Sequence, residues 1–159
     1  MPDRLIEEIG EAECLRLISA GGVGRIAYSS WRFGLVVLPV NFRLHDGAVV
    51  FRTTEHGPLD EDLRTGIADA DYKVTFEIDD IDLAGRQGWS VLIQGPAHHV
   101  TGSERAEGRL PEIDTWPPGE REMFISIVPS RVTGRRISPA LQEGALASGT
   151  AAARPRLRS

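Results

Sequence analysis

The sequence of 159 residues contains little cysteine and no long apolar run. With Cys14 as the only cysteine, a disulfide within the chain is excluded. No apolar segment approaches the ~20 residues that a helix needs to cross a bilayer. Residues 2–10 are too charged to resemble a signal peptide. We therefore expect a cytoplasmic protein that does not associate with membranes.

Positive charge is also scarce. The net charge is −5 and the isoelectric point is about 5.4, whereas nucleic-acid binding needs a basic face. We therefore expect no nucleic-acid partner. Of the 18 basic residues only Lys73 is a lysine. A bound phosphate would thus be contacted mainly by arginine, whose guanidinium can bind it with two hydrogen bonds.

Length and composition fit one domain. Hydrophobic residues make up 41% of the chain, which suffices for a single packed core. We expect this domain to cover residues 1–138. Residues 139–159 are rich in Ala, Gly, Ser and Arg, a composition that predicts a disordered tail.

Short apolar segments alternate with turn signals along the domain. The patterns predict helices over 11–20 and 58–65, and strands over 23–29, 35–42, 48–54, 72–79, 89–101, 123–128 and 131–137. Asp46-Gly47 is typical of a tight hairpin turn. Polar connections are expected over 80–88 and 103–120. Six or seven strands at hairpin spacing favour a closed barrel, since closure removes exposed strand edges.

One segment suggests an anion site. The strand that ends at Phe51, Arg52, Thr53 and Thr54 turns at Gly57 and leads into a helix that begins at Pro58, followed by Leu59. Unpaired amides, the helix dipole and a guanidinium would converge there on a phosphate-bearing small molecule. Threonine is also a good strand former, so a solvated strand end is the alternative.

Other candidate sites are poorly supported. Ser90 lacks the Gly-x-Ser-x-Gly environment of an activated nucleophile. His98 and His99 would point to opposite faces of a strand, so they cannot easily bind one metal ion. We therefore predict no metal site and name no catalytic residue.

Several segments, in order along the chain, resemble the FMN-binding split-barrel family in its pyridoxamine 5′-phosphate oxidase-like branch. They lie at 22–27, 38–42, 46–47, 51–54, 76–79, 88–95, 116–119 and 131–137, within a resemblance over residues 11–138. The resemblance implies a mainly β protein with short helices: a six-stranded Greek-key split β-barrel. It also implies a homodimer with FMN at the subunit interface.

By this resemblance, Arg52 and its two threonine neighbours would hold the flavin phosphate, and residues 40–41 would approach the isoalloxazine. A later strand would contribute residues 89–90, from the same subunit or its partner. The predicted cofactor-binding residues are Val40, Asn41, Phe51, Arg52, Thr53, Thr54, Gly57, Pro58, Leu59, Trp89 and Ser90. Relatives commonly have a lysine where this chain has Pro58, and losing such a charge-assisted contact costs about 1.5–3 kcal/mol.

The resemblance implies an FMN-dependent oxidoreductase-type protein acting on an unidentified small molecule. In such proteins the flavin transfers hydride or electrons while the protein binds and orients it. Because Pro58 removes a basic residue, the deazaflavin coenzyme is the alternative cofactor. The alternative function is a non-catalytic dimer that binds or carries a flavin, a deazaflavin or haem.

Overall fold

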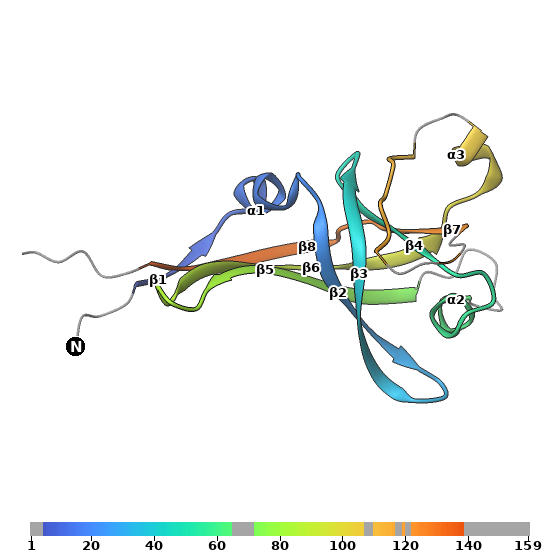
Figure 1. Ribbon diagram of the computed structural model, residues 1–159, viewed down its shortest axis with the longest axis horizontal. Coiled ribbons are helices and arrows are strands. Elements are labelled where there is room, and N and C mark those ends of the chain that lie inside the picture. Colours follow the sequence, from blue (N-terminus) through green and yellow to red (C-terminus); the bar gives the residue numbers. More distant parts are fainter. Residues whose placement is uncertain (1–4, 65–71, 107–109, 117–118, 120–121, 139–159) are drawn as a thin grey trace, which may run out of the picture.

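The computed structural model describes residues 5–64, 72–106, 110–116, 119 and 122–138. Its elements are β1 (Leu5–Ile9), α1 (Glu11–Ile18), β2 (Gly22–Ser30), β3 (Gly34–His45), β4 (Ala48–Thr53), α2 (Pro58–Leu63), β5 (Tyr72–Asp82), β6 (Gln87–His99), α3 (Gly102–Ala106), β7 (Met123–Ile127) and β8 (Arg131–Ser138) (Figure 1). The tail expected over 139–159 lies outside the described residues. Among the described helices, none is long and apolar enough to span a membrane.

Six antiparallel strands close into a barrel in the order β5-β2-β3-β4-β7-β6. The ring closes because β6 pairs with β5 along its length and with β7 through residues 97–99. The earlier half of β6 pairs with β8 instead, and β8 carries β1 on its other edge. The expected mainly β, six-stranded barrel is therefore confirmed.

Strand β6 changes its pairing partner at Gly95: residues 88–94 pair with β8, and residues 97–99 pair with β7. A Cβ atom at Gly95 would lie 1.9 Å from the carbonyl oxygen of Val128. The connection between β7 and β8 crosses β6 at this point: the Val128 N–H donates to the Pro96 carbonyl at 3.0 Å, and the Ser130 N–H donates to the Gln94 carbonyl at 2.8 Å. Only glycine allows two backbones to approach so closely.

The barrel encloses one apolar core. Phe42, Phe51 and Phe76 are each at most 1% exposed, and the rings of Phe42 and Phe76 meet edge to face with centroids 5.0 Å apart. Helix α1 contacts β8 on the outside of the barrel and buries Cys14 and Ile18 (Figure 1). The side chains that hold the barrel together are thus mostly supplied by alternate residues of the strands.

One expectation about local structure was wrong in part. The polar connection expected over 80–88 is shorter, because β5 continues to Asp82 and β6 begins at Gln87, which leaves residues 83–86 as the turn. The Asp82 carboxylate caps the turn by accepting the N–H groups of Ala84 and Gly85 at 3.0 and 2.9 Å. This end of the hairpin is exposed, so its strands need no apolar alternation. The charged N-terminal segment, for which no element was predicted, forms strand β1 at the edge of the sheet.

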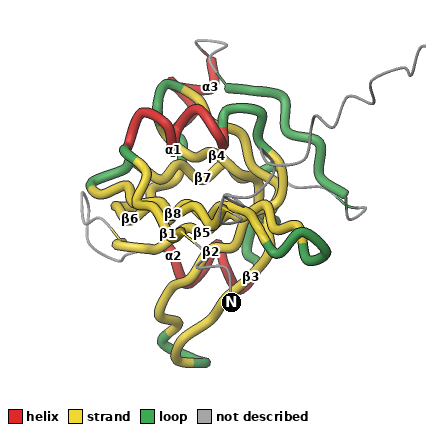
Figure 2. The backbone as a smooth tube through the Cα atoms, turned by 90° about the vertical axis from the view of Figure 1, so that its left-hand side faces the viewer, coloured by secondary structure: helices red, strands yellow, loops and turns green. Residues whose placement is uncertain are grey.

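The hairpin of β2 and β3 projects beyond the barrel (Figure 1, Figure 2). Its strands pair from Gly22–Phe42 to Ser30–Gly34, whereas β5 covers only residues 25–27 of β2. Large apolar side chains are exposed along it: Trp31, Phe33, Leu35 and Val37 retain 83%, 64%, 90% and 62% of their accessible surface. The hairpin therefore has one face free to border a cavity and another that is apolar and uncovered.

Candidate functional site

A hollow of about 450 Å³ lies between the projecting hairpin, the end of β4 and the start of α2. Its lining combines apolar side chains from the hairpin with the polar end of β4. It consists of Tyr28, Phe33, Val36, Leu38, Pro39, Val40, Arg52, Thr53, Thr54, Gly57, Pro58 and Leu59. This volume is in the range of small-molecule sites.

A tight turn carries the chain from β4 into α2 at the edge of this hollow. His56 has a positive φ of 58°, and the Gly57 N–H donates to the Thr54 carbonyl at 3.1 Å. Pro58 then occupies the first turn of the helix, where its fixed φ is favourable and its missing N–H removes no helical hydrogen bond. The turn places the end of β4 and the start of α2 on the same cavity.

The buried carboxylate of Asp60 holds this turn in place. It is fully buried, and Oδ2 accepts the His56 N–H at 2.8 Å and the Arg64 Nη2 and Nε groups at 2.9 and 3.1 Å. Its Oδ1 lies 2.6 Å from Nε2 of His99 on β6. Burial by itself would raise the pKa of Asp60, but the hydrogen bonds from Arg64, His56 and His99 outweigh it and lower the pKa below the ordinary value of 3.8. Asp60 thereby ties α2 to the barrel wall.

These contacts weaken the anion site expected at the start of α2. The helix has only six residues, Pro58 offers no N–H, and the His56 amide is already used by Asp60. The Glu61 N–H donates to the Gly57 carbonyl at 2.9 Å. Among the residues that line the hollow, the positive charge comes from Arg52, whose guanidinium lies 5.2 Å from the centre of the Phe124 ring.

Tyr28 adds a hydroxyl to the hollow that sequence reasoning did not anticipate. Burial, followed by the nearby carboxylate of Asp62, raises the pKa of Tyr28 above its ordinary value of 10. Asp62 is 8% exposed, and within the described part of the chain its Oδ2 atom has no hydrogen-bond partner. The phenol therefore keeps its proton at neutral pH.

The structure brings seven of the residues predicted from sequence onto this hollow: Val40, Arg52, Thr53, Thr54, Gly57, Pro58 and Leu59. Phe51 instead points into the core and is fully buried, so it can only support β4 from behind. The Asn41 Oδ1 atom accepts the Trp116 N–H at 3.2 Å and borders a different, smaller hollow of about 180 Å³.

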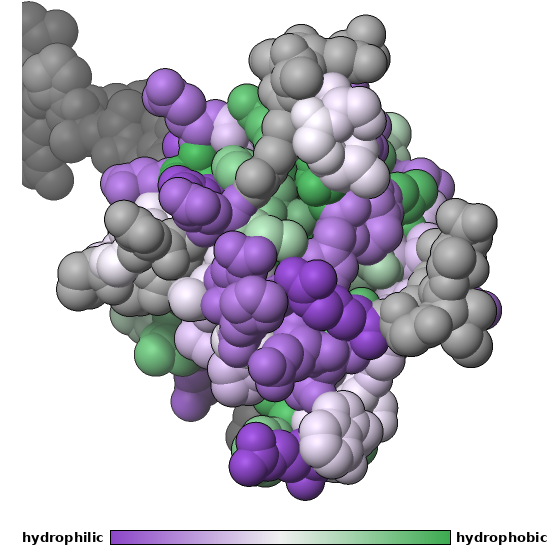
Figure 3. All heavy atoms as spheres, turned by 90° about the vertical axis from the view of Figure 1, so that its right-hand side faces the viewer, coloured by the Kyte–Doolittle hydropathy of each residue, from purple (hydrophilic) through white to green (hydrophobic). Residues whose placement is uncertain are grey.

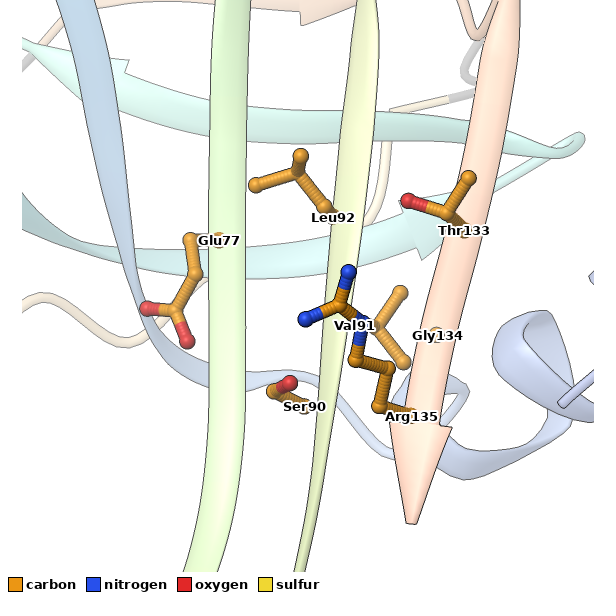
Figure 4. A pocket seen from close by; sticks show the side chains of 7 residues that line it. All are labelled: Glu77, Ser90, Val91, Leu92, Thr133, Gly134 and Arg135. Atoms are coloured by element: carbon orange, nitrogen blue, oxygen red, sulfur yellow. The ribbon is translucent and has the colours of Figure 1, made fainter. Parts of the chain in front are cut away.

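Trp89 and Ser90 also lie elsewhere. Trp89 is half-buried against the core, and Ser90 lines a hollow of about 260 Å³ on the face formed by β5, β6 and β8. Figure 4 shows Glu77 from β5, Ser90 from β6 and Arg135 from β8 around this hollow. Burial and then the charge of Asp79 raise the pKa of Glu77, while Arg25, 3.2 Å away, opposes this. This second hollow shares no lining residue with the first.

Sequence reasoning missed most of the hairpin's contribution. Tyr28, Phe33 and Val36 line the hollow because the hairpin extends past the barrel. Leu38 and Pro39 lie within segment 38–42, which resembles the split-barrel family, and that resemblance could have indicated that they line the site. Asp60 and His99 had no such signal, because their contact joins residues 39 positions apart.

The sequence matches a known protein family. The sequence model of the family described as pyridoxamine 5′-phosphate oxidase matches residues 10–136. The chain belongs to this family. An uncharacterized protein of Mycobacterium tuberculosis is 32% identical over 135 residues, covering 84% of this chain and 87% of that protein.

Solved structures of similar proteins include members that bind flavins. A candidate pyridoxamine 5′-phosphate oxidase from Corynebacterium glutamicum is 27% identical with a TM-score of 0.65, over 87% of this chain and 96% of that one. An FAD-binding protein from Mycobacterium smegmatis is 26% identical with a TM-score of 0.60, over 83% of this chain and 98% of that one. The pyridoxamine 5′-phosphate oxidase-like split barrel is thus shown for this chain, together with its similarity to flavin-binding members.

Proposed function

We propose that this member of the pyridoxamine 5′-phosphate oxidase family binds a flavin in the hollow beside α2 and serves as a flavin-dependent oxidoreductase for a small-molecule substrate. The observation that carries the proposal is that one cavity joins an apolar wall to a guanidinium and two threonine positions. A flavin likewise joins a flat apolar ring system to a phosphate. The similarity to an FAD-binding protein supports the same ligand class.

The residues present fit a flavin. Val36, Leu38 and Leu59 would pack on the ring system, as apolar side chains do in most cofactor sites. The Arg52 guanidinium would pair with a phosphate, assisted by threonine hydroxyls at 53 and 54. When bound, the flavin supplies hydride or electron transfer. The chain itself would bind and orient it, with Tyr28 forming part of the cavity wall.

A homodimer is part of this proposal. Trp31, Leu35 and Val37 form an apolar surface on the projecting hairpin, and exposed apolar patches of this kind usually mark an interface. The face that carries α2, α3 and β7 is by contrast mostly hydrophilic (Figure 3). Because Ser90 and Trp89 lie away from the hollow in their own subunit, they would reach a flavin only from the partner.

Binding of FMN and riboflavin to the Arg52→Ala variant tests the site. We expect FMN affinity to fall at least about tenfold, since a charge-assisted hydrogen bond contributes about 1.5–3 kcal/mol. Riboflavin has no phosphate, so its affinity should stay unchanged. Arg16→Ala, on the exposed surface of α1, is the matched control. A wild-type protein that binds no flavin, or equal losses for both ligands, would contradict the proposal.

The identity of the flavin and the presence of catalysis need separate measurements. Mass analysis of ligand released from the purified protein distinguishes FMN, FAD and a deazaflavin. Turnover of a reduced nicotinamide with an artificial acceptor would support an enzyme, whereas a tightly held, redox-silent ligand would support a carrier. This cavity fits haem poorly, because among the described residues that line it only Tyr28 has a side chain that commonly ligates haem iron.

A further inference from the structure

A groove beside the projecting hairpin takes no part in the flavin binding proposed above. This hairpin groove is bordered by Leu35, Val37, Lys73, Gln94 and Arg131. Its volume is about 590 Å³, whereas the hollow beside α2 has about 450 Å³. The groove is therefore large enough for a small-molecule ligand of its own.

Strand pairing sets the side chains of the groove in one row across five strands. Val37 on β3 pairs with Ala27 on β2, which pairs with Thr75 on β5. Thr75 pairs with Gln94 on β6, and Gln94 pairs with Arg131 on β8. Directly opposed residues point to the same face of a sheet. The apolar hairpin therefore borders the groove on one side and Arg131 borders it on the other.

The charge of the groove is positive. Its lining includes Arg131 and Lys73, the only lysine of the chain, and no aspartate or glutamate is among the described residues that line it. Neither cation forms an ion pair with another described residue. The chain as a whole carries a net charge of −5, so the groove differs from the rest of the molecule in sign. Unneutralised positive charge of this kind attracts an anion.

Hydrogen bonds direct Arg131 over the sheet and toward the groove. Its Nη1 group donates to Oε1 of Gln94 at 3.0 Å, and Nε2 of Gln94 lies 3.5 Å from Oγ1 of Thr75. Gln94 thus holds the guanidinium on the side of β8 that faces the strand of Lys73. Because a guanidinium has five N–H groups, this contact leaves others available to a carboxylate.

The hairpin side of the groove is apolar. Leu35 and Val37 are 90% and 62% exposed, and the buried Val74 and Tyr28 continue the lining toward the barrel. A ligand that covered these side chains would remove apolar surface from water, which favours binding. The groove therefore joins an apolar wall to a cationic one.

We infer that the hairpin groove binds a small monocarboxylic acid with an apolar body. The carboxylate would lie between Arg131 and Lys73, and the hydrocarbon part would lie against Leu35 and Val37. This inference goes beyond the proposed function, because it assigns a second ligand and does not need a bound flavin.

Calorimetric titration with octanoate tests the inference. We expect saturable binding that is at least about tenfold tighter than that of butyrate, because the shorter chain covers fewer apolar groups. Octanoate should also bind about tenfold more tightly than 1-octanol, which has the same chain but no charge.

Variants of the two cations separate the charge from the apolar wall. The double variant Lys73→Gln/Arg131→Gln should weaken octanoate about tenfold and leave 1-octanol unchanged, since each exposed charge contributes up to about fivefold. Arg135→Gln is the matched control, because Arg135 lies on the same strand and face as Arg131 but lines a different hollow. Thermal melting and light scattering check that each variant keeps its fold and its mass.

Three results would overturn the inference. They are the absence of saturable octanoate binding, which would leave a second copy of the chain as the occupant of the groove, equal affinities for octanoate and 1-octanol, and an equal loss in Arg135→Gln. The same preparations are titrated with FMN. Octanoate binding without FMN binding would overturn the proposed function alone, and FMN binding without octanoate binding would overturn this inference alone.

Discussion

Replacement of Asp60 by asparagine tests whether this carboxylate fastens α2 to the barrel. The side chain is fully buried and accepts hydrogen bonds from His56, Arg64 and His99. Asparagine has nearly the same shape, so the substitution leaves the packing volume unchanged. It removes the charge and turns one acceptor into a donor facing the side chains of Arg64 or His99.

The expected loss of stability in Asp60→Asn follows from the buried ion pair that the substitution removes. Removing one member of a buried ion pair typically costs about 3–5 kcal/mol, because the partner charges are left uncompensated. Arg64 is 45% exposed and can regain water, so we expect the low end of that range, about 3 kcal/mol. For a domain of this size each kcal/mol shifts the melting temperature by about 2–4 °C, which predicts a decrease of about 6–12 °C.

The stability that Asp60→Asn loses should be largest at neutral pH and should shrink in acid. The pKa of Asp60 is lower in the folded protein than its ordinary value of 3.8, so its charge stabilises the fold above that value. As pH falls through the lowered pKa, the carboxylate is protonated and this contribution disappears. The stability difference between wild type and Asp60→Asn should therefore be full at neutral pH and shrink below about pH 4.

Urea denaturation at several pH values, followed by circular dichroism, measures both effects. Asp80→Asn, an exposed aspartate on β5, is the matched control and should change stability by less than about 0.5 kcal/mol. Equal stability of the two variants at pH 7 would refute the assignment of Asp60 as a structural anchor. A difference that grows on acidification would refute the sign of its pKa shift.

Three further predictions concern other parts of the molecule. Gly95→Ala should lower the free energy of unfolding by about 1–3 kcal/mol, because its Cβ would meet the Val128 carbonyl; Gly102→Ala, in open space, should not. Cys14 is buried and burial raises its pKa, so its thiol should react with Ellman's reagent at pH 8 only after unfolding; rapid reaction of the folded protein would contradict this. Leu35→Lys should convert the proposed homodimer into a monomer in light scattering, whereas Leu83→Lys should not; unchanged mass would exclude the hairpin as the interface.

Much of the fold follows from local sequence. Alternation in β5 and the Asp46-Gly47 turn identify elements from neighbouring residues alone, and both occur where expected. The continuation of the β5–β6 hairpin into 80–88 and the presence of strand β1 were not predicted, because exposed strands need no apolar alternation. Their pairing with β6 and β8 makes them strands, and pairing partners are not visible in a local pattern.

The sequence by itself determined the part of the site that is contiguous in the chain. Residues 52–54 and 57–59 lie on one cavity because a single turn joins them, and the spacing of a turn is a local property. Tertiary structure alone decided that Tyr28 and Val36 complete the wall, that Ser90 faces a separate hollow, and that Asp60 is buried against His99. The physical reason is that burial of a charge and closure of a cavity depend on partners distant in sequence, which backbone propensity does not encode.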